Sequence, residues 1–207
     1  MKPDADAGPG MGHPVGYAAP ILERTVFFAI ERRKAQAELI RMALTDGLTG
    51  AANRMAMLEF ITSARRRAQR HGRQFALVLL DLDGFKAIND ERGHAVGDAV
   101  LVNLVRIAKQ GTRDSDLVAR IGGDEFVIVL DDIAGRDGAL KSAENIRHRL
   151  LQGFDLDGER FAINASIGIS VWPEDGDTSD ELLAVADASM YREKRSARHA
   201  SVSTAGA

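Results

Sequence analysis

The sequence predicts an α+β fold in which a mainly antiparallel central sheet is covered by helices and follows one long N-terminal helix. Segments with helical periodicity are interspersed with short apolar runs. Two of these runs are joined by Gly122-Gly123-Asp124-Glu125, which is typical of a β-hairpin. With 207 residues, 45% of them hydrophobic, the chain can form one domain of catalytic size and a short appendage.

Composition separates the ends of the chain from its centre. Residues 1–20 contain four glycines and four prolines, so we expect a flexible tail. Residues 21–45 lack both residue types and are predicted to form one helix for signalling and dimerisation, although Arg33 and Gln36 interrupt its apolar seam and leave a coiled-coil partner open. Residues 46–199 form the main domain, and residues 200–207 are expected to be a second flexible tail.

The main domain is predicted to begin with a turn at Thr45-Asp46-Gly47 and a helix from Asn53 to His71. The run Arg65-Arg66-Arg67 in this helix has two interpretations. A nucleic-acid patch is disfavoured, because no aromatic residues interleave with the run and the formal net charge of the chain is −3. We therefore favour a solvated helix face.

The elements that follow alternate between strands and helices. A buried strand from Phe75 to Leu82 carries Asp81 near its end, and Leu117–Ile121 and Phe126–Leu130 form the hairpin. Further strands are expected within Phe154–Val171, and helices near Phe85–Asp90, Gly97–Gln110, Arg136–Gln152 and Asp180–Ser196. This order is typical of an antiparallel sheet with helices on its faces.

Composition also excludes several classes of protein. The chain has no cysteine, which rules out disulfides and thiolate metal sites and fits the reducing cytoplasm. Its longest apolar runs, such as residues 76–80, fall far short of the roughly 20 residues that span a bilayer, and residues 1–20 do not resemble a signal peptide. We therefore expect a cytoplasmic protein without a membrane span, and its acidic net charge predicts no nucleic-acid partner.

Acidic side chains stand at positions that solubility alone does not explain. Asp81 closes an apolar strand, and Asp124 and Glu125 occupy the tip of the hairpin. If the hairpin pairs beside the Asp81 strand, three carboxylates converge at one sheet edge and suit magnesium in a palm-like geometry for phosphoryl transfer. The alternative, equally open from these residues alone, is that the aspartates cap the next helix and Gly-Gly-Asp is only a turn.

Three motifs in sequence order resemble the GGDEF family of diguanylate cyclases, bacterial enzymes that make a second messenger. They are Asp46-Gly-Leu-Thr-Gly50-Ala-Ala-Asn53-Arg54, the segment from Asp81 through Asn89-Asp90 to Gly97-Asp98, and Arg120-Ile-Gly122-Gly123-Asp124-Glu125-Phe126. Ser166-Ile-Gly168 and the segment from Asp187 to Lys194 match a later strand and the last helix. The resemblance covers residues 45–199 and implies the palm-like fold of nucleotidyl cyclases.

The resemblance implies a role for each matching residue. Asp81, the Leu82 carbonyl and Asp124 would bind Mg²⁺, with Glu125 at a second metal position, and Mn²⁺ is expected to substitute. Asp124 would also accept the proton, so Asp124 and Glu125 are the catalytic candidates. Asn89 and Asp98 would recognise guanine, since an ionised carboxylate accepts hydrogen bonds from its ring N–H and amino group. The remaining substrate-binding candidates are Phe85, Lys86, His94, Lys194 and Arg198, which would otherwise be interpreted as ordinary surface or loop residues.

The implied reaction condenses two GTP molecules into cyclic di-GMP and two pyrophosphates at the interface of a symmetric homodimer. Arg113-Asp-Ser-Asp116 lies at the family's spacing before Gly122 for an allosteric product site. There Arg113 and Asp116 would bind cyclic di-GMP and inhibit the enzyme, and a surface ion pair is the alternative. Arg147 and Arg149 are nearby candidates for the second half of this site.

Two further alternatives belong to other classes of protein. The first is a catalytically silent GGDEF module that binds nucleotide and signals by contact, which the intact Gly-Gly-Asp-Glu-Phe loop disfavours. The second is an unrelated palm-type transferase acting on nucleic acid, which the composition disfavours because it offers no basic groove.

Overall fold

The computed structural model of the chain describes residues 18–156 and 158–204. The chain divides after Ala43 into two units. The elements in order are α1 (Ala18–Leu44), α2 (Arg54–His71), β1 (Gln74–Leu82), α3 (Phe85–Arg92), α4 (His94–Gly111), β2 (Leu117–Gly122), β3 (Glu125–Ile133), α5 (Arg136–Gln152), β4 (Phe154–Leu156), β5 (Glu159–Phe161), β6 (Ala165–Trp172) and α6 (Ser179–Thr204).

The first unit consists largely of α1, a single uninterrupted helix. It begins at Ala18 rather than Ile21, because alanine is a strong helix former and proline at position 20 is tolerated in the first turn. Large apolar side chains on it are exposed, among them Phe28 and Leu39. The tail expected before it, up to residue 17, lies outside the described residues. Among the helices that the structure describes, none is long and apolar enough to cross a bilayer.

The second unit is built on a four-stranded antiparallel sheet in the order β2-β3-β1-β6. The hairpin of β2 and β3 lies beside the strand that carries Asp81, and Asp81 is paired in register with Glu125. The antiparallel sheet and its covering helices are therefore confirmed. The strands that the sequence placed only within Phe154–Val171 are β6 of this sheet and the short strands β4 and β5, which form a separate two-stranded sheet.

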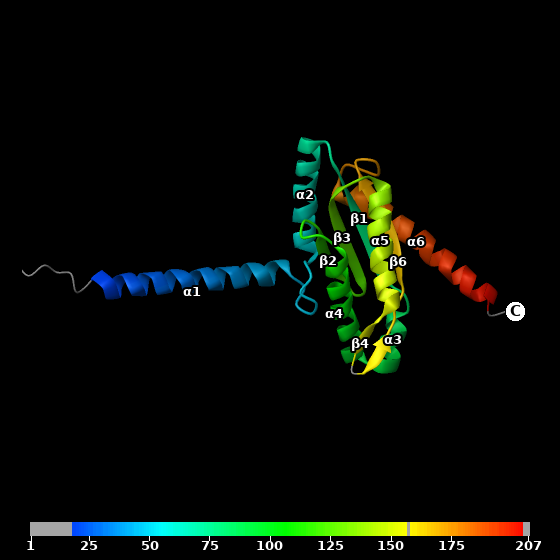
Figure 1. Cartoon of the computed structure of the whole chain (residues 1–207), viewed down its shortest axis with the longest axis horizontal. Coiled ribbons are helices and arrows are strands. Elements are labelled where there is room, and N and C mark those ends of the chain that lie inside the picture. The colour runs from blue at the N-terminus through cyan, green and yellow to red at the C-terminus, as the bar shows by residue number, and fades with distance from the viewer. Residues whose placement is uncertain (1–17, 157, 205–207) are drawn as a thin grey trace, which may run out of the picture. The chain divides into compact units, whose positions relative to one another are not determined.

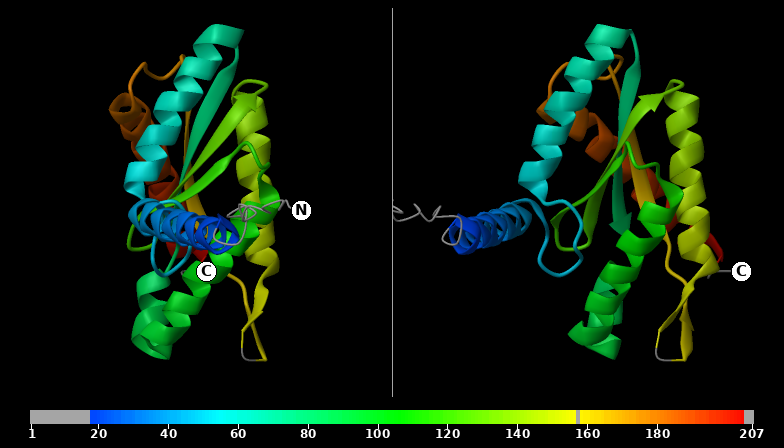
Figure 2. Two further views of the ribbon diagram at one scale, coloured as in Figure 1. Left: turned by 90° about the vertical axis from the view of Figure 1, so that its left-hand side faces the viewer. Right: turned by 60° about the vertical axis from the view of Figure 1, so that its left-hand side comes forward.

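Helices cover both faces of the main sheet (Figure 1). Successive residues of a strand point to opposite faces. Val78 and Leu80 of β1 pack into the core formed with α4 and α5, whereas Leu77 and Leu79 pack into the core formed with α2 and α6. Figure 2 shows the strands between these two layers of helices. Asp81 continues the second set, so its side chain belongs to the face that α6 covers.

Glycines and a capping residue determine several element ends. Asn53 caps α2, since its side chain accepts a hydrogen bond from the Ala56 N–H at 3.0 Å, and Gly72 ends this helix with a φ of 62°. Gly93 alone separates α3 from α4. The bounds of α5 agree with the predicted ones, whereas α6 continues past Ser196 to Thr204 because the residues between contain neither glycine nor proline. The tail predicted from residue 200 is thus helical as far as Thr204.

Side chains from flanking segments cover the outer edge of β6. Among the described strands, β6 pairs with β1 alone. The Ile167 N–H donates to Glu193 Oε2 at 2.7 Å, and Glu193 also binds Arg147 Nη1 of α5 at 2.6 Å. The Val171 N–H donates to Asp175 Oδ2 at 2.6 Å. Two backbone donors that β1 does not use are therefore satisfied.

Candidate active site

The ends of β1 and β3 bring the predicted acidic residues together. Asp81 is 8% exposed in the penultimate position of β1, and Glu125 opposite it is the first residue of β3. Asp124 lies half-buried in the turn before β3, where Gly123 has a φ of 49° that disfavours residues with a side chain. The hairpin therefore presents Asp124 and Glu125 beside Asp81, as the sequence pattern predicted.

Electrostatic repulsion between these carboxylates favours a cation. Burial raises the pKa of Glu125, and the neighbouring charges of Asp81, Asp124 and Asp187 raise it further, while Lys194 acts in the opposite direction. Asp187 of α6 was not among the predicted site residues. The only sequence signal for it was its place at the start of the last family motif.

Lys194 reaches the same cluster from α6. Its Nζ lies 2.6 Å from Asp81 Oδ1, in an ion pair that is largely shielded from solvent. The approach of α6 depends on Gly168 of β6, because a Cβ there would overlap the Ala186 carbonyl and lie 2.6 Å from the Met190 backbone nitrogen. The structure thus places a predicted phosphate-binding residue at the carboxylates. The side chain of Arg198 lies outside the described part of α6.

The predicted guanine-recognition residues lie where α3 meets α4. Asn89 is half-buried on α3 and Asp98 is exposed on α4. A Cβ on Gly97 would overlap the side-chain amide of Asn89, so the two helices pack closely beside Asp98. Phe85 packs against the core at the start of α3, whereas Lys86 and His94 are exposed at the starts of their helices. The structure therefore brings Asn89 next to the residue that precedes Asp98.

An ion pair connects the start of the domain to the hairpin tip. Arg120 donates from Nη1 to Asp46 Oδ1 at 3.1 Å and from Nε to the Gly123 carbonyl at 2.9 Å. Burial disfavours ionisation of Asp46, but hydrogen bonds from Thr49 and Arg120 outweigh it, so the pKa of Asp46 is lowered. Neither Asp46 nor Arg120 was predicted as a site residue, although both stand in the family motifs.

The carboxylates suit a cation that phosphate oxygens help to bind. In the part of the chain that the structure describes, no three acidic or histidine side chains converge closely enough to bind a metal by themselves. Mg²⁺ is commonly bound by one or two carboxylates together with phosphate oxygens and water. Asp81 and Asp124 offer such a partial set, and the ammonium group of Lys194 already pairs with Asp81.

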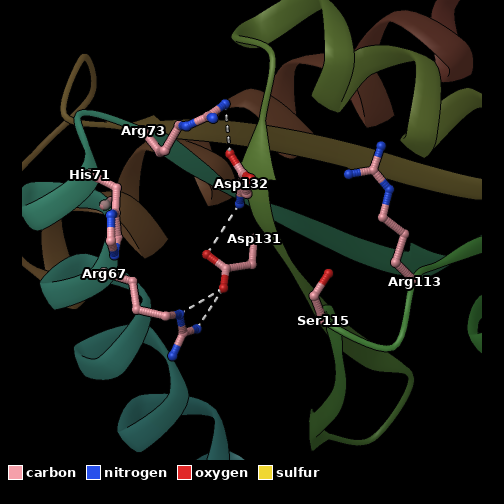
Figure 3. Close-up of a pocket in the computed structure, with 8 residues that line it drawn as sticks. Arg67, His71, Arg73, Arg113, Ser115, Asp131 and Asp132 are labelled. Atoms are coloured by element: carbon pink, nitrogen blue, oxygen red, sulfur yellow. Dashed lines mark hydrogen bonds and ion pairs between the residues drawn. The ribbon is translucent and has the colours of Figure 1, made fainter.

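Arg113 and Asp116 lie in the turn that leads into β2. Both oxygens of Asp116 accept backbone hydrogen bonds, from Arg113 N at 2.8 Å and from Asp131 N at 3.0 Å, so this carboxylate connects the turn to β3. Arg113 lines a pocket of about 470 Å³ (Figure 3). Its other lining residues are Arg67, Ala68, His71, Arg73, Ser115, Asp131 and Asp132.

The arginines suggested for the second half of the product site lie on α5. Arg147 pairs with Glu193 across the edge of β6 and lines a different pocket. Arg149 donates to Asn145 within its own helix. Arg67 and Arg73 instead share the pocket of Arg113. The run Arg65-Arg66-Arg67 was the sequence signal for Arg67, and Arg73 had none.

Comparison with known proteins gives matches over most of the chain. The family described as "Diguanylate cyclase, GGDEF domain" matches residues 43–200. The chain is 40% identical over 176 residues to the bifunctional diguanylate cyclase/cyclic di-GMP phosphodiesterase MucR of Pseudomonas aeruginosa, covering 85% of this chain and 26% of MucR. It is 42% identical over 163 residues to the diguanylate cyclase TpbB of the same organism, covering 78% of this chain and 38% of TpbB. The chain thus spans well under half the length of these two curated relatives.

Solved structures match in fold. The GGDEF domain of TpbB superposes with a TM-score of 0.71 at 42% identity, covering 73% of this chain and 89% of that one. The coiled coil and GGDEF domain of DgcB from Caulobacter crescentus, solved in complex with c-di-GMP, superposes with a TM-score of 0.76 at 27% identity, covering 86% of this chain and 94% of that one.

Proposed function

Because the chain belongs to the GGDEF family of diguanylate cyclases, we propose that it condenses two GTP molecules into cyclic di-GMP and two pyrophosphates. The observation that supports this most directly is the pairing of Asp81 with Glu125 beside Asp124, on an intact Gly-Gly-Asp-Glu-Phe loop. A catalytically silent module would not require these carboxylates to converge. The cysteine-free composition and the use of GTP favour the cytoplasm as the site of the reaction.

Each residue of the site has a part in this reaction. Asp81, Asp124 and the Leu82 carbonyl would hold Mg²⁺ or Mn²⁺, with Glu125 at a second position. When bound, the metal would lower the pKa of the attacking 3′-hydroxyl and stabilise charge on the α-phosphate. Asp124 accepts the hydroxyl proton. Lys194, paired with Asp81 in the structure, shifts to the triphosphate together with Lys86 and Arg198.

Recognition of guanine is assigned to the junction of α3 and α4. Asn89 and Asp98 pair with the edge of the base, while Phe85 and His94 line the pocket. A site that pairs these polar groups with guanine discriminates against adenine, whose edge leaves them unsatisfied.

A homodimer is required because one domain holds one GTP. Phe28, Leu39 and Met42 of α1 fall on one face of that helix and are exposed in the single chain. Burial of this face against a second copy would bring two half-sites within reach of each other. We therefore assign dimerisation to α1.

Product inhibition is assigned to the pocket of Arg113 (Figure 3). Cyclic di-GMP carries two phosphates, and guanidinium groups bind phosphates well. Arg67 and Arg73 stand across the pocket from Arg113, so we place the second half of the product site there rather than at Arg147 and Arg149. Asp116 contributes by fixing the turn that carries Arg113.

The activity is tested by incubating the purified chain with GTP and Mg²⁺ and identifying the product by mass spectrometry. We expect cyclic di-GMP, and we expect Asp81→Asn and Asp124→Asn to reduce turnover at least a hundredfold while the thermal transition persists. Asp155→Asn, an exposed change on the β4–β5 hairpin, serves as the matched control and should leave turnover as it is. A folded wild type that binds GTP without forming product would establish the silent module instead.

A further inference from the structure

Opposite charges are combined in the pocket of Arg113. Arg67, Arg73 and Arg113 provide three guanidinium groups, and Asp131 and Asp132 provide two carboxylates (Figure 3). The two phosphates of cyclic di-GMP attract the arginines and are repelled by the aspartates, since like charges repel. The contacts of the two aspartates indicate what they do.

Asp131 engages Arg67 with good geometry. Its Oδ2 lies 2.8 Å from Arg67 Nε and 2.6 Å from Nη2. The carboxylate of Asp131 also accepts the Asp132 N–H through Oδ1 at 3.1 Å, and the backbone of Asp131 is fixed by its N–H, which donates to Asp116. The side chain of Asp131 is 14% exposed and that of Arg67 is 44% exposed. Asp131 is therefore a preorganised anion that occupies one side of the Arg67 guanidinium.

Asp132 engages Arg73 more loosely. The Arg73 Nη1 to Asp132 Oδ1 distance is 3.4 Å, and both side chains are largely exposed. Asp132 has a φ of 50°, and it alone among the described residues other than glycine has a positive φ. Within the described part of the chain, the guanidinium of Arg113 makes no ion pair, and Figure 3 shows it apart from both aspartates. Two of the three arginines are thus neutralised from within the protein.

We propose that Asp131 and Asp132 are built-in counter-anions that compete with the phosphates of cyclic di-GMP for Arg67 and Arg73, and so set the product concentration at which feedback begins. Arg113 receives the first phosphate, and the second must displace Asp131 from Arg67. The inference rests on the proposed product site and adds to it the two residues that weaken binding. Because Asp131 is fixed through Asp116, it acts as a constant competitor and not as a chance surface contact.

The test is calorimetric titration of cyclic di-GMP into the purified full chain and its variants. Asp131→Asn keeps the Oδ1 acceptor and the shape of the side chain but removes the negative charge that pairs with Arg67. We therefore expect the Kd for cyclic di-GMP to fall about fivefold. Asp132→Asn should lower it about twofold, since the pair with Arg73 is longer and more exposed, and asparagine tolerates a positive φ. Asp137→Asn, on an exposed residue outside the pocket, is the control for charge and should leave the Kd unchanged.

A double variant separates competition from a general charge effect. If Asp131 acts through Arg67, Asp131→Asn should give no gain in the background of Arg67→Ala. A gain that persists without Arg67, or a Kd for Asp131→Asn equal to that of a binding-competent wild type, would overturn the counter-anion role and leave the product site standing. Failure of every variant, wild type included, to bind cyclic di-GMP would overturn both. Circular dichroism melts confirm that each variant is folded.

Discussion

Gly97 leaves room for the side chain of Asn89, a proposed guanine-recognition residue. A Cβ at this position would overlap the amide of Asn89, which sits at the end of a rotatable side chain, so Asn89 would move while the backbone stays in place. Alanine is also the better helix former, by about 1 kcal/mol. Gly97→Ala should therefore fold normally but raise the KM for GTP about tenfold and reduce the preference for GTP over ATP.

The control for this variant is Gly138→Ala on α5. It makes the same helix-stabilising change, and its added Cβ would meet only Ala134 at an ordinary 3.9 Å. Steady-state kinetics with GTP, together with competition by ATP, measure both effects. An unchanged KM in a folded Gly97→Ala protein would show that Asn89 does not need this position.

Asp46 stabilises the domain through its hydrogen bonds from Thr49 and Arg120. Its pKa lies below the ordinary value of 3.8, so the stabilisation is present above that pH and is lost as the pH falls through the folded-state pKa. Asp46→Asn should lower the free energy of unfolding by about 2 kcal/mol at pH 7. The difference from wild type should shrink below pH 3.8, as urea unfolding at several pH values would show. A difference independent of pH would contradict an ionic origin.

At the level of residues, the sequence predicted which side chains lie together where their positions follow from a strand or a hairpin. Asp81 and Asp124 could be placed together because one ends a strand and the other lies in a hairpin. The Asp46 to Arg120 pair spans 74 positions in the sequence, and no periodicity connects its partners. The Asn89 to Gly97 contact depends on the angle between two short helices. Such contacts follow from tertiary packing and were missed.

The packing of α6 on β6 determines where Lys194 lies. An alanine at Gly168 would place its Cβ against the Ala186 carbonyl and the Met190 nitrogen, and backbone atoms cannot rotate away as a side chain can. Gly168→Ala should cost about 1–3 kcal/mol of stability by overpacking and should lower kcat by moving Lys194. Thermal melts and initial rates measure the two effects. A Gly168→Ala variant with the stability and the rate of wild type would contradict this close packing of α6 on β6.

For helices and strands, the local sequence pattern predicted where an element begins and ends better than it predicted which elements lie beside each other. The bounds of α5 agree with the structure because a glycine lies at each end. The place of β6 beside β1 could not be predicted, since long-range antiparallel pairing leaves no local signal. The two short strands β4 and β5 carry too few residues for a periodic pattern.

The whole molecule is expected to work as a dimer. Specific activity should rise with enzyme concentration until dimers saturate. Leu39→Glu places a charge on the apolar face of α1 and should shift that rise to at least tenfold higher concentration, because a buried unpaired charge is costly. Light scattering and initial rates at a series of dilutions provide the measurement.

Ile30→Glu is the matched control for dimerisation. Residue 30 is exposed on the same helix, and nine positions at 3.6 residues per turn place it opposite Leu39. It should leave the concentration dependence close to that of wild type. Flat specific activity at every dilution, from a protein that is monomeric throughout, would contradict a dimeric enzyme.

The covered edge of β6 has a consequence for solubility during assembly. An open strand edge is a template on which other chains can add strands and grow into fibres. Glu193 and Asp175 occupy the backbone donors of Ile167 and Val171 that such a strand would use, and ion pairs with Arg147 and Arg136 hold these two carboxylates at the edge. The outer edge of β6 is thus blocked at these two positions, which disfavours the addition of strands from other chains and the aggregates that such addition builds.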